Sequence, residues 1–306
     1  MEIFLPIAHM DVNLLLIIFF GGIVGFLSGL VGVGGGFLIT PLLIFVGVPP
    51  LVAVGTGAAQ IVGTSAGGTY AHWRLGNVDM KMGAVLLLGS WSGGAWGVQI
   101  AKMLEEGGNF GNAVTFLYVG LLGIVGFSML LESLNALRGA GKSAAQPAGA
   151  KNSKVGWLQS LPLQMDFPIS NLRISLLLPV IIGVGVGILT SLMGVGGGFI
   201  MVPVMIYLLR MPTKVVVGTS LFQLLFTTAE VATLQAGVNH AVDPLLAIVL
   251  ILGSVFGTQW GIRLGAKLPG EHLRLILALV VVAVAAKMLY GILVKPDELY
   301  TLALTR

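Results

Sequence analysis

The chain has 306 residues, of which 56% are hydrophobic and only 9% are charged, and it contains 45 glycines and no cysteine. Soluble domains carry charge on about a quarter of their residues, so this composition excludes a soluble domain and predicts a multi-pass membrane protein. The membrane expected for it is the cytoplasmic (inner) cell membrane. Without cysteine there is no disulfide, thiolate nucleophile or cysteine-ligated metal. The formal net charge of +4 is small and spread over loops, so we expect no nucleic-acid partner.

The expected transmembrane segments are apolar runs of about the length needed to cross a bilayer. In chain order they occupy residues 14–31, 51–70, 82–101, 113–131, 174–193, 215–234, 245–262 and 273–294. Two shorter apolar runs, at residues 37–48 and 199–209, each follow a glycine-rich string. The first run is expected to remain in the mature protein, because Glu2 and Asp11 stand where a signal peptide carries Lys or Arg.

An internal repeat relates the two halves of the chain. The string VGVGGGFLITP at residues 31–41 returns as MGVGGGFIMVP at residues 193–203. Further matches, in the same order and at nearly constant offset, pair residues 54–60 with 217–223 and residues 89–97 with 253–261. The chain is therefore predicted to be one tandem duplication, with a first transmembrane repeat at residues 1–138 and a second at residues 172–306.

The segment between the repeats, residues 139–171, loses the hydrophobicity of its surroundings and carries Lys142, Lys151 and Lys154. It is predicted to be a basic cytoplasmic linker, because positive residues favour the cytoplasmic side of a membrane. Its second part has two open interpretations: plain disorder, or a short helix on the membrane surface built from Trp157, Leu158, Leu161 and Phe167.

The same charge rule predicts the topology. If each glycine string turns the chain back, the basic loops of both repeats face the cytoplasm and each repeat crosses the membrane an odd number of times. The two repeats then have opposite orientations, which is the plan of many secondary transporters. The expected fold is all-α and polytopic, with two tandem repeats of inverted topology, each containing a glycine-broken helix hairpin and three spanning helices.

The two glycine strings are the first candidate site. Consecutive glycines are poor helix formers, and a helix that begins after such a break offers free N–H groups and the positive end of its dipole to an anion. Substrate contact is therefore predicted for Gly34, Gly35, Gly36, Gly196, Gly197 and Gly198. The alternative is close helix packing, which is expected for the spaced glycines of residues 21–29, 89–97 and 253–265. Alanine at Gly35 or Gly197 is accordingly expected to weaken anion binding more than folding.

Polar residues inside the apolar runs are the second candidate site, since a polar side chain there needs a partner or a function. The predicted ligands of the anion are Thr56, Gln60, Thr219, Ser220 and Gln223. In each repeat the threonine and the glutamine are four residues apart, so they share one helix face. The alternative is hydrogen bonding between helices.

Two charged residues are candidates for coupling or gating. Glu230 lies near the end of its apolar run and is either a proton-coupling site or a carboxylate paired at an interface. Arg263 is either an anion-attracting charge or a side chain that reaches the headgroups. The four histidines are scattered without metal-ligand spacing, so no metal site is expected.

The doubled string, with the VGT and glutamine motifs that follow each copy and with GNVD at residues 76–79, resembles the TauE/SafE family of sulfite exporter or sulfonate permease type. The resemblance covers nearly the whole chain except the linker. It implies a secondary transporter, preferably an exporter, of a small sulfur-containing anion such as sulfite or an organosulfonate, without a cofactor. Proton coupling and a homo-oligomer are compatible with it. The second repeat has AGVNHAVD at residues 236–243 instead of GNVD, which leaves the role of that loop open.

Two other functions are weighed against a carrier. A passive anion channel would share the same composition. An intramembrane serine hydrolase would use Ser65, which lies in a G-x-S-x-G pattern at residues 63–67. A nucleophile elbow, however, needs a strand before the serine and a helix after it, and this pattern lies inside an apolar helical run, so no enzyme is expected.

Overall fold

The computed structural model describes residues 2–31, 34–138, 163–170, 172–209, 211–265 and 270–293, and most of them are helical. Among the described residues, three helical segments are long and apolar enough to cross a membrane, at Phe110–Leu131, Val215–Val238 and Pro244–Gly261. Shorter apolar helical segments lie at Leu14–Leu30, Gly36–Phe45, Leu177–Met193 and Ala278–Gly291. The expected all-α, polytopic fold is confirmed.

The first half of the chain begins with a hairpin of two short strands, β1 (Glu2–Leu5) and β2 (Met10–Asn13). The helices that follow are α1 (Leu14–Val31), α2 (Gly36–Phe45), α3 (Pro50–Arg74), α4 (Met80–Glu106) and α5 (Phe110–Arg138). Short turns join α2 to α3, α3 to α4 and α4 to α5. A short helix after the glycine break is thus followed by three long helices.

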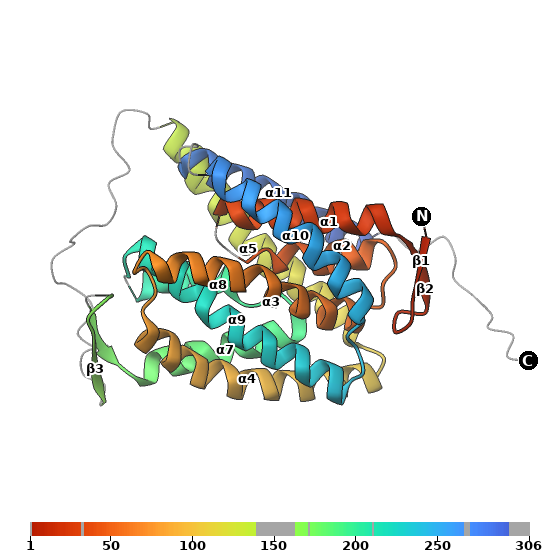
Figure 1. Ribbon diagram of the computed structural model, residues 1–306, viewed down its shortest axis with the longest axis horizontal. Coiled ribbons are helices and arrows are strands. Elements are labelled where there is room, and N and C mark those ends of the chain that lie inside the picture. Colours follow the sequence, from red (N-terminus) through yellow and green to blue (C-terminus); the bar gives the residue numbers. More distant parts are fainter. Residues whose placement is uncertain are drawn as a thin grey trace, which may run out of the picture.

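The second half repeats this order. A hairpin of β3 (Gln164–Phe167) and β4 (Leu172–Ser175) precedes the helices. These are α7 (Leu177–Met193), α8 (Gly198–Pro203) with the π-helical turn η1 (Val204–Leu208), α9 (Thr213–Val238), α10 (Pro244–Gly265) and α11 (Gly270–Leu293). The two hairpins lie at opposite ends of the molecule (Figure 1).

The hairpin β3–β4 begins inside the segment predicted as linker. Phe167 lies in β3 and is 1% exposed. Both interpretations of this part of the linker, disorder and a surface helix, are therefore wrong at Phe167, because this residue pairs with Leu172 in an antiparallel hairpin. Trp157, Leu158, Leu161 and the three linker lysines lie outside the described residues.

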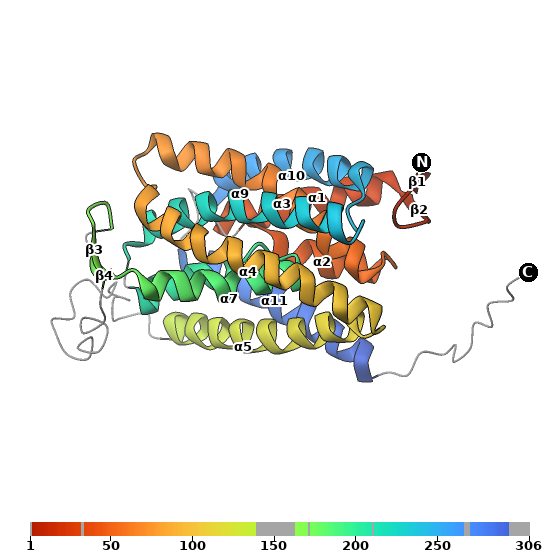
Figure 2. The ribbon, with the colours of Figure 1, turned by 90° about the horizontal axis from the view of Figure 1, so that it is seen from below.

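Each half packs its helices against the other half. α1 lies against α10, α4 against α7, α3 against α9 and α5 against α11, and Figures 1 and 2 show these helices side by side along the long axis of the molecule. This pairing is symmetric, since exchanging the halves converts each contact into another contact of the same set.

Close glycine contacts give the direction of the helices. Cβ atoms built on Gly89, Gly93 and Gly97 of α4 would meet Val180, Val184 and Ile188 of α7, so these two helices are parallel. Likewise, Gly253, Gly257 and Gly261 of α10 meet Ile18, Gly22 and Phe26 of parallel α1. α4 is antiparallel to α3, and α10 is antiparallel to α9. Since α3 and α9 are themselves antiparallel, α4 and α10 run in opposite directions. Their parallel partners, α7 and α1, therefore also run in opposite directions. How the two halves are oriented relative to a membrane stays a prediction.

The spaced glycines serve helix packing, as predicted. A Cβ on Gly93 would lie 2.1 Å from the carbonyl oxygen of Val184, and one on Gly257 would lie 2.1 Å from that of Gly22. A Cβ on Gly25 would lie 2.2 Å from the carbonyl oxygen of Ser254. The helix backbones are therefore in direct contact, which only glycine permits at these positions.

Asp79 ties the two halves together at one end of the molecule. It is 1% exposed, and its Oδ1 accepts from the N–H of Met82 at 3.0 Å, which caps the start of α4. Its Oδ2 accepts from the N–H and the hydroxyl of Ser170, in the β3–β4 turn, at 3.1 and 2.5 Å. The N–H of Asp79 donates to Oγ1 of Thr219 in α9 at 3.0 Å.

Asp243 makes the equivalent links at the other end. Its Oδ1 accepts from the N–H groups of Leu245 and Leu246, both at 3.1 Å, and its Oδ2 accepts from the N–H of Ile7 in the β1–β2 turn at 3.0 Å. Its own N–H donates to Oγ1 of Thr56 in α3 at 3.0 Å. The loop before Asp243 thus performs the same structural task as GNVD, although its sequence departs from that motif.

Candidate substrate site

The two glycine strings interrupt the helices at equivalent places. Gly35 and Gly197, which directly precede α2 and α8, have φ angles of 71° and 74°. Positive φ angles occur in these strings at Gly34, Gly35, Gly194, Gly196 and Gly197. Glycine adopts this left-handed backbone without steric cost, so the strings are breaks in which consecutive glycines are required; Gly32 and Val33 lie outside the described residues.

The strings meet in the buried interior. A Cβ on Gly36 would lie 2.0 Å from Ile61 of α3 and 2.9 Å from the carbonyl oxygen of Val195 in the second string. Gly34 and Gly196 both face Leu224 of α9. The next residues, Phe37 and Phe199, stack with ring centroids 4.9 Å apart. The structure thus brings the two predicted halves of the site together.

Protein atoms surround these glycines closely. A Cβ on Gly35 would lie 2.9 Å from Cβ of Ser28 and 3.0 Å from the carbonyl oxygen of Val24, and one on Gly197 would lie 2.1 Å from Val186. The expectation that alanine affects binding more than folding assumed free space at these glycines, and the close neighbours contradict that assumption. The added methyl group meets packed neighbours and also requires an unfavourable positive φ.

Gln223 of α9 is part of a closed hydrogen-bond cluster. Its Nε2 donates to Oγ of Ser90 in α4 at 3.2 Å and to Oγ1 of Thr227 at 3.1 Å. The two hydroxyl oxygens are 2.9 Å apart and bond to each other. Only Oε1 of Gln223 has no hydrogen-bond partner within the described part of the chain.

Gln60, the equivalent residue of α3, differs. It is 0% exposed, and neither its Nε2 nor its Oε1 has a hydrogen-bond partner among the described residues. One turn further on, Thr64 Oγ1 bonds to the carbonyl oxygens of Ile61 at 3.0 Å and Gly34 at 3.4 Å. The Ser65 hydroxyl is buried, faces Gly34 and also lacks a described partner. Unpaired polar groups therefore gather on α3 beside the first glycine string.

The structure contradicts a nucleophile elbow at Ser65. The serine lies in the interior of the continuous helix α3, so the required strand and turn are absent at this place. Among the described residues, its hydroxyl has no hydrogen-bond partner.

Thr56, Thr219 and Ser220 are placed differently from the glutamines. The two threonine hydroxyls accept the N–H groups of Asp243 and Asp79 at the two ends of the molecule. The Ser220 hydroxyl donates to the carbonyl oxygen of Val217 at 3.0 Å. All three side chains are buried, and each forms a hydrogen bond with the backbone. Their contact with a substrate stays a prediction.

The two charged candidates lie apart from the glycine strings. Glu230 is half-buried in α9, and its Oε2 faces Gly94 of α4. Arg263 lies in the last turn of α10 with an exposed side chain. The exposed position of Arg263 agrees with the interpretation that its side chain reaches the lipid headgroups.

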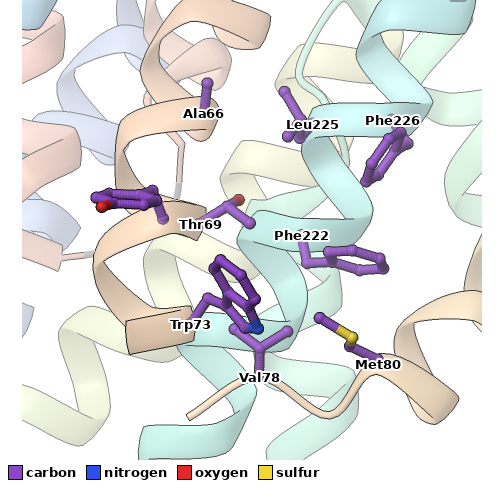
Figure 3. Close-up of a pocket in the computed structure, with 9 residues that line it drawn as sticks. Ala66, Thr69, Trp73, Val78, Met80, Phe222, Leu225 and Phe226 are labelled. Carbon is purple, nitrogen blue, oxygen red and sulfur yellow. The ribbon is translucent and has the colours of Figure 1, made fainter. Parts of the chain in front are cut away.

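A separate pocket of about 290 Å³ lies between the last turns of α3 and the middle of α9 (Figure 3). Its lining is almost entirely apolar and aromatic: Ala66, Thr69, Tyr70, Trp73, Val78, Met80, Phe222, Leu225 and Phe226. This lining offers an anion no charged partner. Its hydroxyl groups are those of Thr69 and Tyr70. The pocket is therefore a poor candidate for the anion site.

Buried helix breaks in a polytopic helical bundle, flanked by unpaired polar side chains, are typical of membrane transporters, in which irregular backbone at membrane depth lines the binding site. The comparisons agree on this class. The family model described as "Sulfite exporter TauE/SafE" matches residues 17–288, and the chain belongs to the TauE/SafE family.

Relatives match over nearly their whole length. The probable membrane transporter protein YunE of Bacillus subtilis (strain 168) is 27% identical over 286 residues, which cover 91% of this chain and 98% of YunE. YjnA of the same organism, also a probable membrane transporter protein, is 29% identical over 89% of this chain and 98% of its own. A probable membrane transporter protein of Xylella fastidiosa (strain 9a5c) is 29% identical, with coverage of 88% and 92%. No solved structure matches the chain.

Proposed function

We propose that this protein is a secondary transporter that exports a small sulfur-containing anion, such as sulfite or an organosulfonate, across the cytoplasmic membrane. The observation that carries the proposal is Gln60, whose amide is fully buried without a described partner, one helical turn before Thr64, which bonds to Gly34 of the first glycine string. Each buried polar atom left unpaired costs about 1–3 kcal/mol. A bound oxyanion offers acceptors to Nε2 of Gln60 and to the hydroxyl of Ser65, and so removes part of this cost.

The recognition is expected to use neutral donors. Helix α2 begins beside these side chains, and the first N–H groups of a helix have no partner within it. Together with the helix dipole they favour an anion. The family's description as a sulfite exporter supports the substrate class and the direction of transport.

A passive channel is the second candidate, and transport kinetics separate it from a carrier. Proteoliposomes that contain the purified protein are loaded with sulfite or a short anionic organosulfonate, and efflux is followed as the internal concentration rises. A carrier saturates and exchanges internal for external substrate. Flux that stays linear and shows no exchange would instead establish a channel.

Replacement of Gln60 by leucine tests the site. Leucine removes the unpaired amide, so the variant is expected to remain as stable as the wild type or to gain stability. Loss of one hydrogen bond to a charged ligand, about 1.5–3 kcal/mol, corresponds to a tenfold to hundredfold weaker anion affinity. Gln223→Leu is the matched control and is expected to lower stability, since it opens a closed cluster. Unchanged transport by Gln60→Leu would remove Gln60 from the site.

A further inference from the structure

Glu230 places a carboxylate in a half-buried position in the helix bundle. Its Oε2 is inaccessible and has no hydrogen-bond partner among the described residues. A Cβ on Gly94 would lie 2.8 Å from this oxygen, so the carboxyl group rests directly on the backbone of α4. A carboxylate anion is costly in such surroundings unless it is paired, whereas the neutral acid loses far less hydration energy.

No charged group is placed to pair with Glu230 in the described part of the elements packed against α9. α7 and α8 carry no titratable residue, and the titratable residue of η1 is Tyr207. On α3, the titratable residues lie at the end that faces the start of α9, where Gly218 meets His72. They are Tyr70, His72 and Arg74.

The charged residues of α4 also lie far from Gly94. α4 is parallel to α9, with Gly83 beside Phe222 and Gly94 beside Glu230. Its charges lie near its two ends, at Lys81, Lys102, Glu105 and Glu106. The nearest in sequence, Lys102, is two helical turns beyond Gly94 and exposed, so a proton is the simplest partner that neutralises Glu230.

Hydrogen-bonding groups line both sides of Glu230 along α9. Toward the glycine strings, Thr227 is bonded to Ser90 and Gln223. Toward the end of α9, Ser191 Oγ donates to the carbonyl oxygen of Gly94 at 2.8 Å, and Nε2 of Gln235 donates to the carbonyl oxygen of Ser191 at 3.1 Å. Asn239, in the half-exposed turn after α9, bonds to Gln235. Glu230 is thus the titratable residue that lies on α9 between these two groups of hydrogen bonds, and among the described residues its Oε2 is bonded to neither group.

The other half of the molecule has no such group. In the repeat, Gln60 and Gln223 are equivalent, and the position equivalent to Glu230 is Gly67. Gly67 is exposed, and a Cβ there would meet nothing within 4 Å. The fold therefore does not require a carboxylate at this place, which favours a functional reason for Glu230.

We propose that Glu230 is the proton-binding site that couples anion transport to the proton gradient. The inference rests on the transport function proposed above. The carboxylate takes up one proton from the aqueous phase at the Asn239 end and becomes a neutral acid, and it returns the proton when the transporter changes conformation. No bond other than O–H forms or breaks.

Two measurements test this site. Infrared difference spectroscopy of the purified protein, without substrate, is expected to show a protonated carboxyl band that disappears as the pH is raised. Glu230→Gln removes the band and Glu230→Asp retains one, while the control Glu105→Gln, at an exposed residue near the end of α4, leaves it unchanged. A wild-type protein without a titrating band that depends on Glu230 overturns the proposal.

Transport in proteoliposomes is the second measurement. Anion flux of the wild type and of Glu105→Gln is expected to rise severalfold under a pH gradient, while Glu230→Gln loses this stimulation and keeps exchange of labelled for unlabelled anion at equal pH. Stimulation retained by Glu230→Gln overturns the coupling site. Failure of the wild type to exchange any tested anion would count against the proposed transport function, whereas the infrared result judges the proton site independently.

Discussion

Replacing Asp79 by alanine removes every hydrogen bond that its carboxylate makes at one end of the molecule. The cap of α4 at Met82 is worth about 1 kcal/mol, and each bond from Ser170 to the charged carboxylate is worth about 1.5–3 kcal/mol. At the lower end of these ranges, the loss is about 4 kcal/mol. For a chain of this length, about 2 °C of melting temperature correspond to 1 kcal/mol, so the midpoint is expected to fall by roughly 8 °C.

The assay is thermal unfolding of the purified protein in detergent, followed by tryptophan fluorescence. Asp79→Asn is expected to fall between the wild type and Asp79→Ala, because the amide oxygen preserves one acceptor while the NH2 group cannot accept from Ser170. Asp243→Ala should resemble Asp79→Ala, and the exposed Asp11 provides the control. A midpoint for Asp79→Ala within 2 °C of the Asp11→Ala midpoint would refute the assigned role of the carboxylate.

Three more predictions concern packing and topology. Gly93→Ala should lower the melting temperature, because its Cβ would lie 2.1 Å from a carbonyl oxygen of α7; Gly120→Ala, with nothing within 4 Å, should not. Gly35→Ala should cost about 1–3 kcal/mol from strain and overpacking combined, and a melting temperature equal to that of the wild type would contradict the tight packing around the string. Leu75 and Pro49 are exposed and lie beyond opposite ends of α3. On whole cells, Pro49→Cys should react with a membrane-impermeant maleimide, and Leu75→Cys should not react. Labelling of Leu75→Cys from outside would overturn the predicted orientation.

The helix breaks were predictable because their cause is local. The first apolar run, residues 14–31, coincides with α1, and the three consecutive glycines that follow stop the helix wherever they stand. The repeated motifs also predicted the repeated element order. Neither inference needs a contact between residues distant in sequence.

The hairpins and their aspartates were missed because their stability comes from distant contacts. Ser170 bonds to Asp79 across 91 positions, and Ile7 bonds to Asp243 across 236. The four-residue strands carry no pattern of their own that separates them from loop sequence. The repeat comparison offered one signal, because an aspartate ends both GNVD and AGVNHAVD.

The difference between the two glutamines lies beyond any sequence pattern. Gln60 and Gln223 occupy equivalent positions, yet only Gln223 meets a serine of the opposing helix. Ser90 and its counterpart Ser254 of α10 both donate to a carbonyl oxygen of their own helix, but Ser254 is not bonded to Gln60. The difference depends on how the helices pack, which the repeated motifs do not reveal.

The contact of α1 with α10 has a consequence for synthesis of the protein. Gly21 lies against Leu250, and at about 5–20 residues per second roughly 10 to 50 seconds pass between the emergence of these two residues from the ribosome. Throughout this time the backbone of α10, which packs against Gly21 and Gly25 of α1 in the folded protein, has not yet been synthesised. The nascent first half is therefore expected to depend on the translocon, lipid or an insertion factor to cover α1 until α10 arrives, and premature truncation before α10 should leave a half-protein that the cell degrades.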